Sequence, residues 1–109
     1  MQIVTKAHTA FINDIKNAND SLQEITSKQA ELLLLNVVID LSQDAQLSLD
    51  DVKLFSALAK EFKKKKKSFV LVANQINLNK VPAAINVVPT VLEAEDLIEM
   101  EEIERDLGF

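Results

Sequence analysis

The chain has 109 residues, 48% of them hydrophobic, so it is long and apolar enough to fold as one domain around a buried core. It contains no cysteine, one histidine and one glycine, which excludes disulfides, Cys-ligated zinc, thiol catalysis and a glycine-rich phosphate-binding loop. Its formal net charge of −5 opposes long-range attraction to nucleic acids and anionic membranes.

These properties predict a cytoplasmic protein with no membrane association. The N-terminus has no basic segment followed by an apolar one, as a signal peptide would. The longest apolar run is far shorter than the roughly 20 residues that a membrane span needs. The absence of cysteine suits a reducing compartment.

The N-terminal segment predicts a strand followed by helix. Residues 2–6 are short, alternating and rich in β-branched side chains, which is typical of a strand. From Thr9, a suitable capping residue, apolar side chains recur at helical spacing, so residues 9–30 are expected to be helical. Ser21 and Glu24 form a second capping-box pattern, which leaves open whether this is one helix or two. The expected apolar face holds Phe11, Ile15, Ala18, Leu22 and Ile25.

Residues 33–41 are the most apolar run and predict the central strand. The triplet Val37-Val38-Ile39 is β-branched, which favours a strand over a helix. Nearly every position is apolar, as in a strand covered on both faces. Ser48 is expected to cap the helix that follows, with Asp50 and Asp51 at the positive end of the helix dipole.

A second strand and a short third one follow that helix. Residues 68–73 are apolar throughout and predict another central strand. Residues 74–80 form a polar loop rich in asparagine, and residues 81–84 are expected to make one helical turn, with Pro82 near its start. Residues 86–88 predict the last strand.

The C-terminal segment predicts a helix over residues 91–107. Thr90 and Glu93 form a capping-box pattern before it, and Gly108 ends it. The order is therefore β-α-β-α-β-β-α over residues 1–109. This order predicts a single α/β domain with about four mainly parallel strands and three main helices, joined by right-handed crossovers.

Carboxylates gather where the central strand ends. Asp40, Asp44, Asp50 and Asp51 are compatible with a Mg²⁺ or phospho-acceptor site, because hard cations need converging carboxylates. A solvated loop with helix-capping carboxylates is favoured, because no well-placed lysine or threonine supports a phospho-acceptor. A single histidine, His8, cannot complete a catalytic triad or a zinc site. We therefore expect no metal, no cofactor and no enzymatic activity.

Two charged segments are candidate surfaces. The acidic C-terminal helix is either a docking surface for a basic partner or a plain amphipathic helix. The basic segment is either an anion- or RNA-binding surface or a solvated helix end, and the second is favoured because no aromatic side chains are interleaved for base stacking. This basic segment, or lysine segment, consists of Lys60, Lys63, Lys64, Lys65, Lys66 and Lys67.

Three stretches resemble the STAS domain of proteins similar to anti-sigma-factor antagonists. The sequence Asn-Val-Val-Ile-Asp-Leu-Ser at residues 36–42 leads into a polar loop and a helix, and residues 87–94 are similar to the opening of the last STAS helix. The ending Met-Glu-Glu-Ile-Glu-Arg-Asp-Leu-Gly-Phe at residues 100–109 resembles the tail of small bacterial STAS-like proteins, some of which are labelled ribonuclease Z.

The resemblance implies a regulatory module that binds a protein partner, either an anti-sigma factor or a kinase-like protein. In such antagonists a serine at the start of the helix after the central strand is phosphorylated, and the added charge abolishes binding. The family pattern there is Asp-Ser-Ser/Thr-Gly. An ungapped alignment puts Leu49 at the phosphorylated position and Asp51 at the glycine, and Ser48 is the phosphorylation site only if the loop shifts by one residue.

The resemblance also sets expectations for the remaining surface. Asp50 and Asp51 are expected to mimic a permanently phosphorylated state, so that the switch is degenerate. The N-terminal hairpin of the family is expected to be reduced to one strand, and the chain is expected to be a monomer or a weak homodimer. The expected partner-binding residues are Ser42, Asp44, Ser48, Leu49, Asp50 and Asp51.

An alternative function is that of an RNA-processing accessory protein associated with ribonuclease Z. It would bind RNA through the lysine segment. The chain cannot itself be a two-zinc hydrolase of that kind, because one histidine does not supply the necessary ligands.

Overall fold

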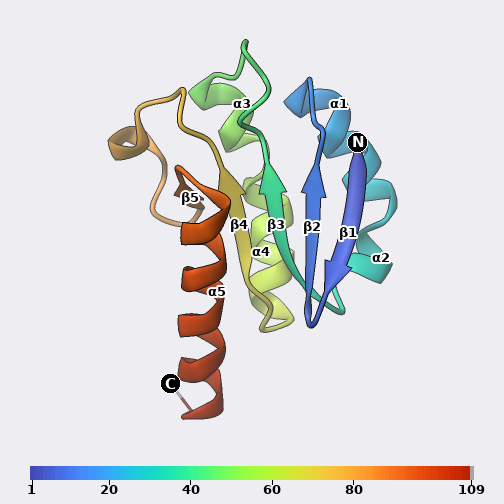
Figure 1. The fold of residues 1–109 in the computed structure, drawn as a ribbon, viewed down its shortest axis with the longest axis vertical. Helices are drawn as coiled ribbons and strands as arrows, with labels where there is room; N and C mark the ends of the chain where they lie inside the picture. Colours follow the sequence, from blue (N-terminus) through green and yellow to red (C-terminus); the bar gives the residue numbers. More distant parts are fainter. Residues whose placement is uncertain (109) are drawn as a thin grey trace.

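A five-stranded sheet in the order β1-β2-β3-β4-β5 runs through the middle of the computed structural model, which describes residues 1–108 (Figure 1). β1 and β2 are antiparallel, and each later strand is parallel to its neighbour. The predicted α/β class with a mainly parallel sheet is confirmed, with five strands in place of about four. The strands are β1 (Gln2–Lys6), β2 (Thr9–Asn13), β3 (Asn36–Asp40), β4 (Phe69–Val72) and β5 (Asn86–Val88).

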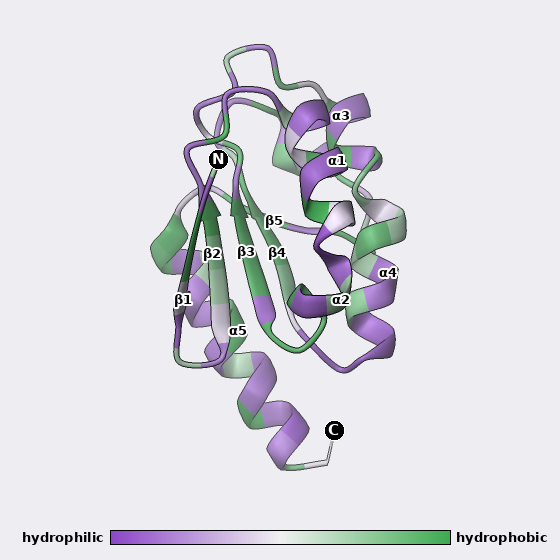
Figure 2. Ribbon diagram, turned by 90° about the vertical axis from the view of Figure 1, so that its right-hand side faces the viewer, coloured by the Kyte–Doolittle hydropathy of each residue, from purple (hydrophilic) through white to green (hydrophobic). Residues whose placement is uncertain are grey.

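The helices cover both faces of this sheet (Figure 2). Helices α1 to α4 lie on one face and α5 lies on the other, so the fold has three layers. The connections from β2 to β3 and from β3 to β4 both cross the same face, as repeated crossovers of one hand do. The helices are α1 (Ala18–Ser27), α2 (Gln29–Leu32), α3 (Leu49–Lys53), α4 (Ser56–Lys64) and α5 (Val91–Asp106), with a 3-10 turn η1 (Leu78–Lys80).

The two central strands are buried on both faces, as their continuous apolar sequences predict. In β3, Val37 and Ile39 pack in the core beneath α1 to α4, whereas Val38 packs in the second core beneath α5. β4 alternates in the same way, with Leu71 on the first face and Val70 on the second. Because strand side chains alternate between faces, a sheet covered on both sides needs apolar residues at every position.

The helix predicted from Thr9 is wrong at its start, because residues 9–13 form β2. Ala10 and Ile12 pack in the larger core, while Phe11 packs against the smaller one on the opposite face. The positive φ of Ala7, 54°, turns the chain so that β1 and β2 form a hairpin. Phe11 and Ile15 matched the helical spacing although they lie on a strand and in the loop after it. The expectation of a reduced N-terminal hairpin is therefore also wrong.

Helix α1 begins at neither of the two predicted caps. Its N-cap is Asn17, whose side chain accepts a hydrogen bond from the backbone N–H of Asp20 at 3.0 Å. Ser21 lies inside the helix, where its hydroxyl donates to the carbonyl of Ala18 at 2.7 Å. Helices α1 and α2 are separate elements, which resolves the alternative of one helix or two.

The other differences from the predicted elements are local. The helix capped by Ser48 is divided into α3 and α4 at Leu54 and Phe55. Residues 81–84 are not helical. A 3-10 turn forms before them, where the Asn77 side chain accepts from the N–H of Asn79 at 3.0 Å. The C-terminal helix is confirmed, with Thr90 as its N-cap and Gly108 at a φ of 83° after its end.

Burial in the core predicts different costs for the same substitution at two isoleucines. Ile12 is 0% exposed on β2, and Ile103 is 52% exposed on α5. Ile12→Ala is expected to lower the free energy of unfolding by about 2–5 kcal/mol, because it removes buried methyl groups and leaves a cavity. Ile103→Ala is expected to cost less than about 1 kcal/mol. Urea denaturation measures both, and equal costs would contradict the placement of β2 in the core.

Candidate functional site

The side chain of Asp44 anchors the loop between β3 and α3 through hydrogen bonds to backbone N–H groups. This side chain is 4% exposed, and one carboxylate oxygen accepts from the backbone N–H of Ala18 at 2.8 Å. The other oxygen accepts from the N–H of Gln46 at 2.9 Å. Because Ala18 is the first residue of α1, the carboxylate also lies at the positive end of that helix dipole. Asp44 therefore positions the loop and does not present its carboxylate to a partner.

A second anchor, Gln75, comes from the loop after β4. Its side-chain N–H₂ donates to the carbonyl of Leu41 and to the carbonyl of Asp44, both at 2.9 Å. The loop after β3 is thus held by α1 on one side and by the loop after β4 on the other. Sequence reasoning missed Gln75, because one amide in a polar loop carries no local signal of a partner more than 30 residues away.

The start of the loop is a tight turn closed by Asp40 and Ser42. The Asp40 carboxylate accepts from the backbone N–H of Ser42 at 3.0 Å and from its hydroxyl at 2.6 Å. Such aspartate turns are common at the end of a strand. Ser42 is exposed, and its hydroxyl is held in place by this bond.

The end of the loop is a complete capping box, as predicted for Ser48. The Ser48 hydroxyl accepts from the N–H of Asp51 at 3.2 Å, and the Ser48 N–H donates to the Asp51 carboxylate at 3.0 Å. Asp51 also accepts from the side-chain amide of Asn19 at 3.4 Å, which links α3 to α1. Ser48 and Asp50 are exposed, whereas Leu49 is half-buried.

The six predicted partner-binding residues therefore differ in exposure. Ser42, Ser48 and Asp50 are exposed, Leu49 and Asp51 are half-buried, and Asp44 is buried. The aspartates do not converge, since each carboxylate is occupied by the hydrogen bonds above or faces solvent. Within residues 1–108, no three His, Cys, Asp or Glu side chains are grouped as a metal site requires.

A groove lies between α1 and the α3–α4 junction, and its lining includes Leu54, three residues after the Ser48–Asp51 capping box. Leu54 lines it and is 55% exposed. The groove has a volume of about 200 Å³. Its lining residues are Leu22, Thr26, Gln29, Leu54, Ala57, Leu58 and Glu61.

The lysine segment lies at the opposite end of the sheet. It occupies the last turn of α4 and the turn before β4, where the parallel strands begin, whereas the loop after β3 lies where they end. Lys63 to Lys66 are exposed and Lys67 is half-buried. Lys64 pairs with Glu61 at 3.4 Å, and within residues 1–108 the other five lysines of the segment form no ion pair. The loop and the lysine segment are therefore separate surfaces.

Comparison with known proteins assigns no family to this arrangement. No protein-family model matches the chain, and no curated protein sequence matches it.

His8 is exposed in the turn between β1 and β2. Of the helices within residues 1–108, none has both the length and the apolar character needed to cross a membrane.

The anchoring role of Asp44 predicts a stability loss that an exposed aspartate does not share. Asp44→Asn replaces one of the two acceptor oxygens by an N–H₂ group, which cannot accept a hydrogen bond. The N–H of either Ala18 or Gln46 therefore loses its acceptor. We expect the free energy of unfolding to fall by about 1–3 kcal/mol, because a buried backbone N–H loses its partner. Asp50→Asn is the matched control and is expected to change it by less than about 0.5 kcal/mol. Urea denaturation of the two variants at neutral pH measures both, and equal effects would contradict the anchoring role.

Proposed function

We propose that this protein is a non-enzymatic regulatory module of STAS type that binds a protein partner through the loop after β3 and the adjoining apolar groove. The N-terminal hairpin that the resemblance implies is present, which removes one departure from the family pattern. The residues that carry the resemblance occupy matching elements: residues 36–42 form β3 and the turn after it, and residues 87–94 lead from β5 into α5.

The observation that carries the proposal is the fixed loop next to an exposed leucine. Asp44, Gln75 and the Ser48–Asp51 capping box hold the backbone of the loop in one conformation. A surface that is already ordered loses little conformational entropy on binding. Leu54 supplies an apolar centre, and the polar side chains of the loop supply a rim, which is the usual composition of a protein–protein interface.

We propose that the phosphorylation switch on this surface is degenerate. Asp50 and Asp51 place two carboxylates in the first turn of α3, where phosphorylation of an antagonist would add negative charge. Leu49, at the aligned position, has no hydroxyl to phosphorylate. The hydroxyl of Ser48 is exposed and caps the same turn, so it is the phosphorylation site in the alternative with a loop shifted by one residue.

RNA binding through Lys63 to Lys67 is the second candidate function. The lack of ion pairs on four of these lysines supports it. The net charge of −5 and the nearby carboxylates of Glu101 and Glu104 oppose it.

The partner proposed for the loop after β3 is an anti-sigma-factor or kinase-like protein, as the resemblance implies.

Partner binding is expected to depend on Leu54. When the wild-type protein is used to capture partners from native extract, Leu54→Glu is expected to reduce recovery of the dominant partner at least about tenfold, because it places a charge at the apolar centre of the interface. Leu34→Glu is the matched control, since Leu34 is 74% exposed in the turn before β3, at the opposite end of that strand. Quantitative mass spectrometry compares the three baits. Recovery that is equal for all three would contradict docking at this groove.

Any phosphate added to this loop by kinases of the same extract is expected on Ser48. Intact-mass measurement should then show at most one phosphate on the wild type and none on Ser48→Ala. The alanine variant also loses the helix cap, at a cost of about 1 kcal/mol, so its folding is confirmed by circular dichroism. A phosphate that persists on Ser48→Ala would contradict the assignment.

A further inference from the structure

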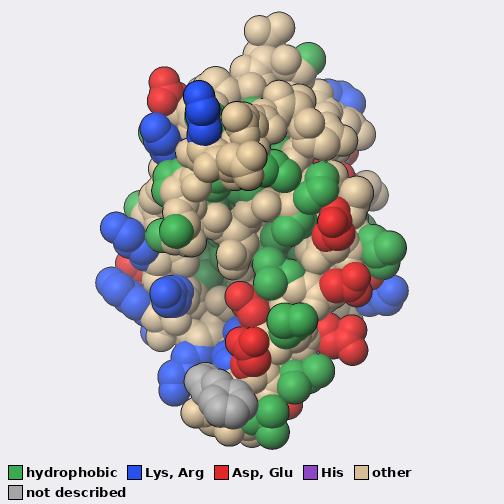
Figure 3. All heavy atoms as spheres, turned by 90° about the vertical axis from the view of Figure 1, so that its left-hand side faces the viewer, with side chains coloured by type: hydrophobic (Ala, Val, Ile, Leu, Met, Phe, Trp, Pro, Cys, Tyr) green, Lys and Arg blue, Asp and Glu red, His purple; other side chains and the backbone are tan. Residues whose placement is uncertain are grey.

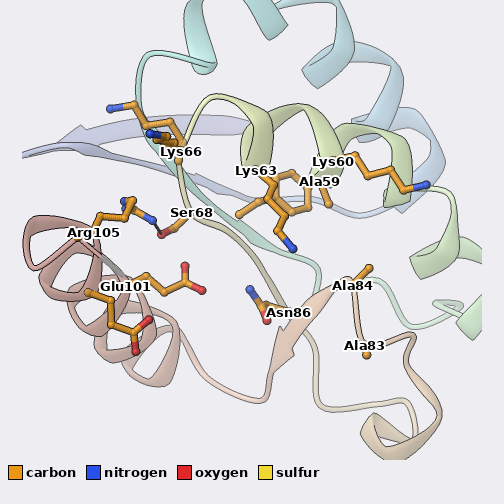
Figure 4. Close-up of a pocket in the computed structure, with 14 residues that line it drawn as sticks. Ala59, Lys60, Lys63, Lys66, Ser68, Ala83, Ala84, Asn86, Glu101 and Arg105 are labelled. Carbon is orange, nitrogen blue, oxygen red and sulfur yellow. Dashed lines mark hydrogen bonds between the residues drawn. The ribbon is translucent and has the colours of Figure 1, made fainter.

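A groove with oppositely charged walls separates α4 from the C-terminal half of α5. It has a volume of about 720 Å³ and lies where β4 and β5 begin (Figure 4). Phe69 and Ala84 contribute apolar surface to its lining. The α4 wall and the turn after it carry Lys60, Lys63, Lys66 and Lys67, and the α5 wall carries Glu101 and Glu104.

The two walls do not neutralise each other. Lys63 reaches from α4 into the groove in Figure 4, yet within residues 1–108 no ion pair joins the two helices. Arg105, also on the α5 wall, donates to the hydroxyl of Ser68 at 3.2 Å and to the side-chain carbonyl of Asn36 at 3.4 Å. Its guanidinium is therefore turned toward the sheet. Within residues 1–108, charges of both signs therefore remain unpaired along the groove.

The solvent side of α5 adds exposed apolar area beside the groove. Leu92, Met100, Ile103 and Leu107 are 52–67% exposed and follow helical spacing, on the side opposite the buried Ala94 and Ile98. The C-terminal part of α5 projects beyond the sheet (Figure 1). Figure 3 shows the resulting face, with lysines on one side, carboxylates and apolar side chains over α5 on the other, and a hollow between them.

We propose that this face is a self-complementary interface through which two copies of the chain form a twofold-symmetric dimer. In such an interface residue i of one copy contacts residue j of the other, and j contacts i. The lysine wall of each copy then faces the acidic wall of its partner, and the apolar side chains of α5 are covered at the same time. A lysine-rich peptide would neutralise only the acidic wall, and a polyanion only the lysine wall. A second copy supplies both charges.

Charge reversal tests this arrangement, because each reversed wall is complementary to the other. Lys63→Glu with Lys67→Glu removes the net positive charge of the α4 wall, because Lys60 and Lys66 then balance two carboxylates, and Glu101→Lys with Glu104→Lys makes both walls basic. Each double variant alone is expected to raise the dimer dissociation constant at least about tenfold. An equimolar mixture of the two is expected to restore dimerisation, because the introduced glutamates of one variant then face the introduced lysines of the other. Sedimentation velocity measures all four samples, and high salt is expected to weaken the wild-type dimer.

A matched control separates contact from net charge. Lys6→Glu with Lys80→Glu reverses two exposed lysines outside the groove and is expected to leave the dissociation constant within about twofold of the wild type. Circular dichroism confirms that each variant is folded. The proposal is overturned if the wild type remains monomeric up to millimolar concentration, including if it binds a lysine-rich peptide or an RNA oligomer as a monomer. It is also overturned if the mixture stays monomeric, or if the control weakens the dimer as much as the groove variants do.

Discussion

Burial of β3 and β4 on both faces is the constraint on which the rest of the structure depends. Alternate side chains of these strands enter two separate cores, and each fully buried Val, Leu or Ile contributes roughly 1.5–3 kcal/mol relative to exposure. Both faces must therefore be covered. Helices α1 to α4 cover one face as the chain passes between parallel strands, and α5 covers the other after the last strand.

The same arrangement gives the two ends of the sheet different surfaces. Where the strands end, the loop after β3 is fixed by contacts from α1 and from the loop after β4, so backbone and polar side chains are held in one geometry. Where the strands begin, β5 is too short to fill the edge of the sheet, and α4 and α5 are left facing each other across an open groove. The first end is the surface proposed to bind a different protein, and the second is the surface proposed to bind a second copy of the chain.

The four aspartates between the last residue of β3 and the first turn of α3 show how one type of side chain takes different roles within a short segment. Asp40 closes a turn, Asp44 joins the loop to α1, and Asp51 completes a helix cap. Asp50 alone among the four makes no side-chain hydrogen bond within residues 1–108 and is exposed. A dense group of carboxylates in sequence is therefore here mainly a set of backbone acceptors, which the preference of aspartate for turns and helix caps explains.

The sequence by itself determined the features that depend on neighbouring residues. The strands around Val37-Val38-Ile39 and residues 69–72, the Ser48–Asp51 cap, and the end of α5 at Gly108 follow from β-branching, continuous apolarity, cap chemistry and the freedom of glycine at positive φ. Tertiary structure decided what local pattern leaves ambiguous. Residues 9–13 match a helical spacing but pair with β1 and β3, because strand pairing there completes a sheet that both cores require. The contacts of Asp44 with Ala18 and of Gln75 with Leu41 join residues far apart in the chain, and the groove brings Lys63 of α4 and Glu101 of α5 into one lining, so only the packed fold brings these residues together.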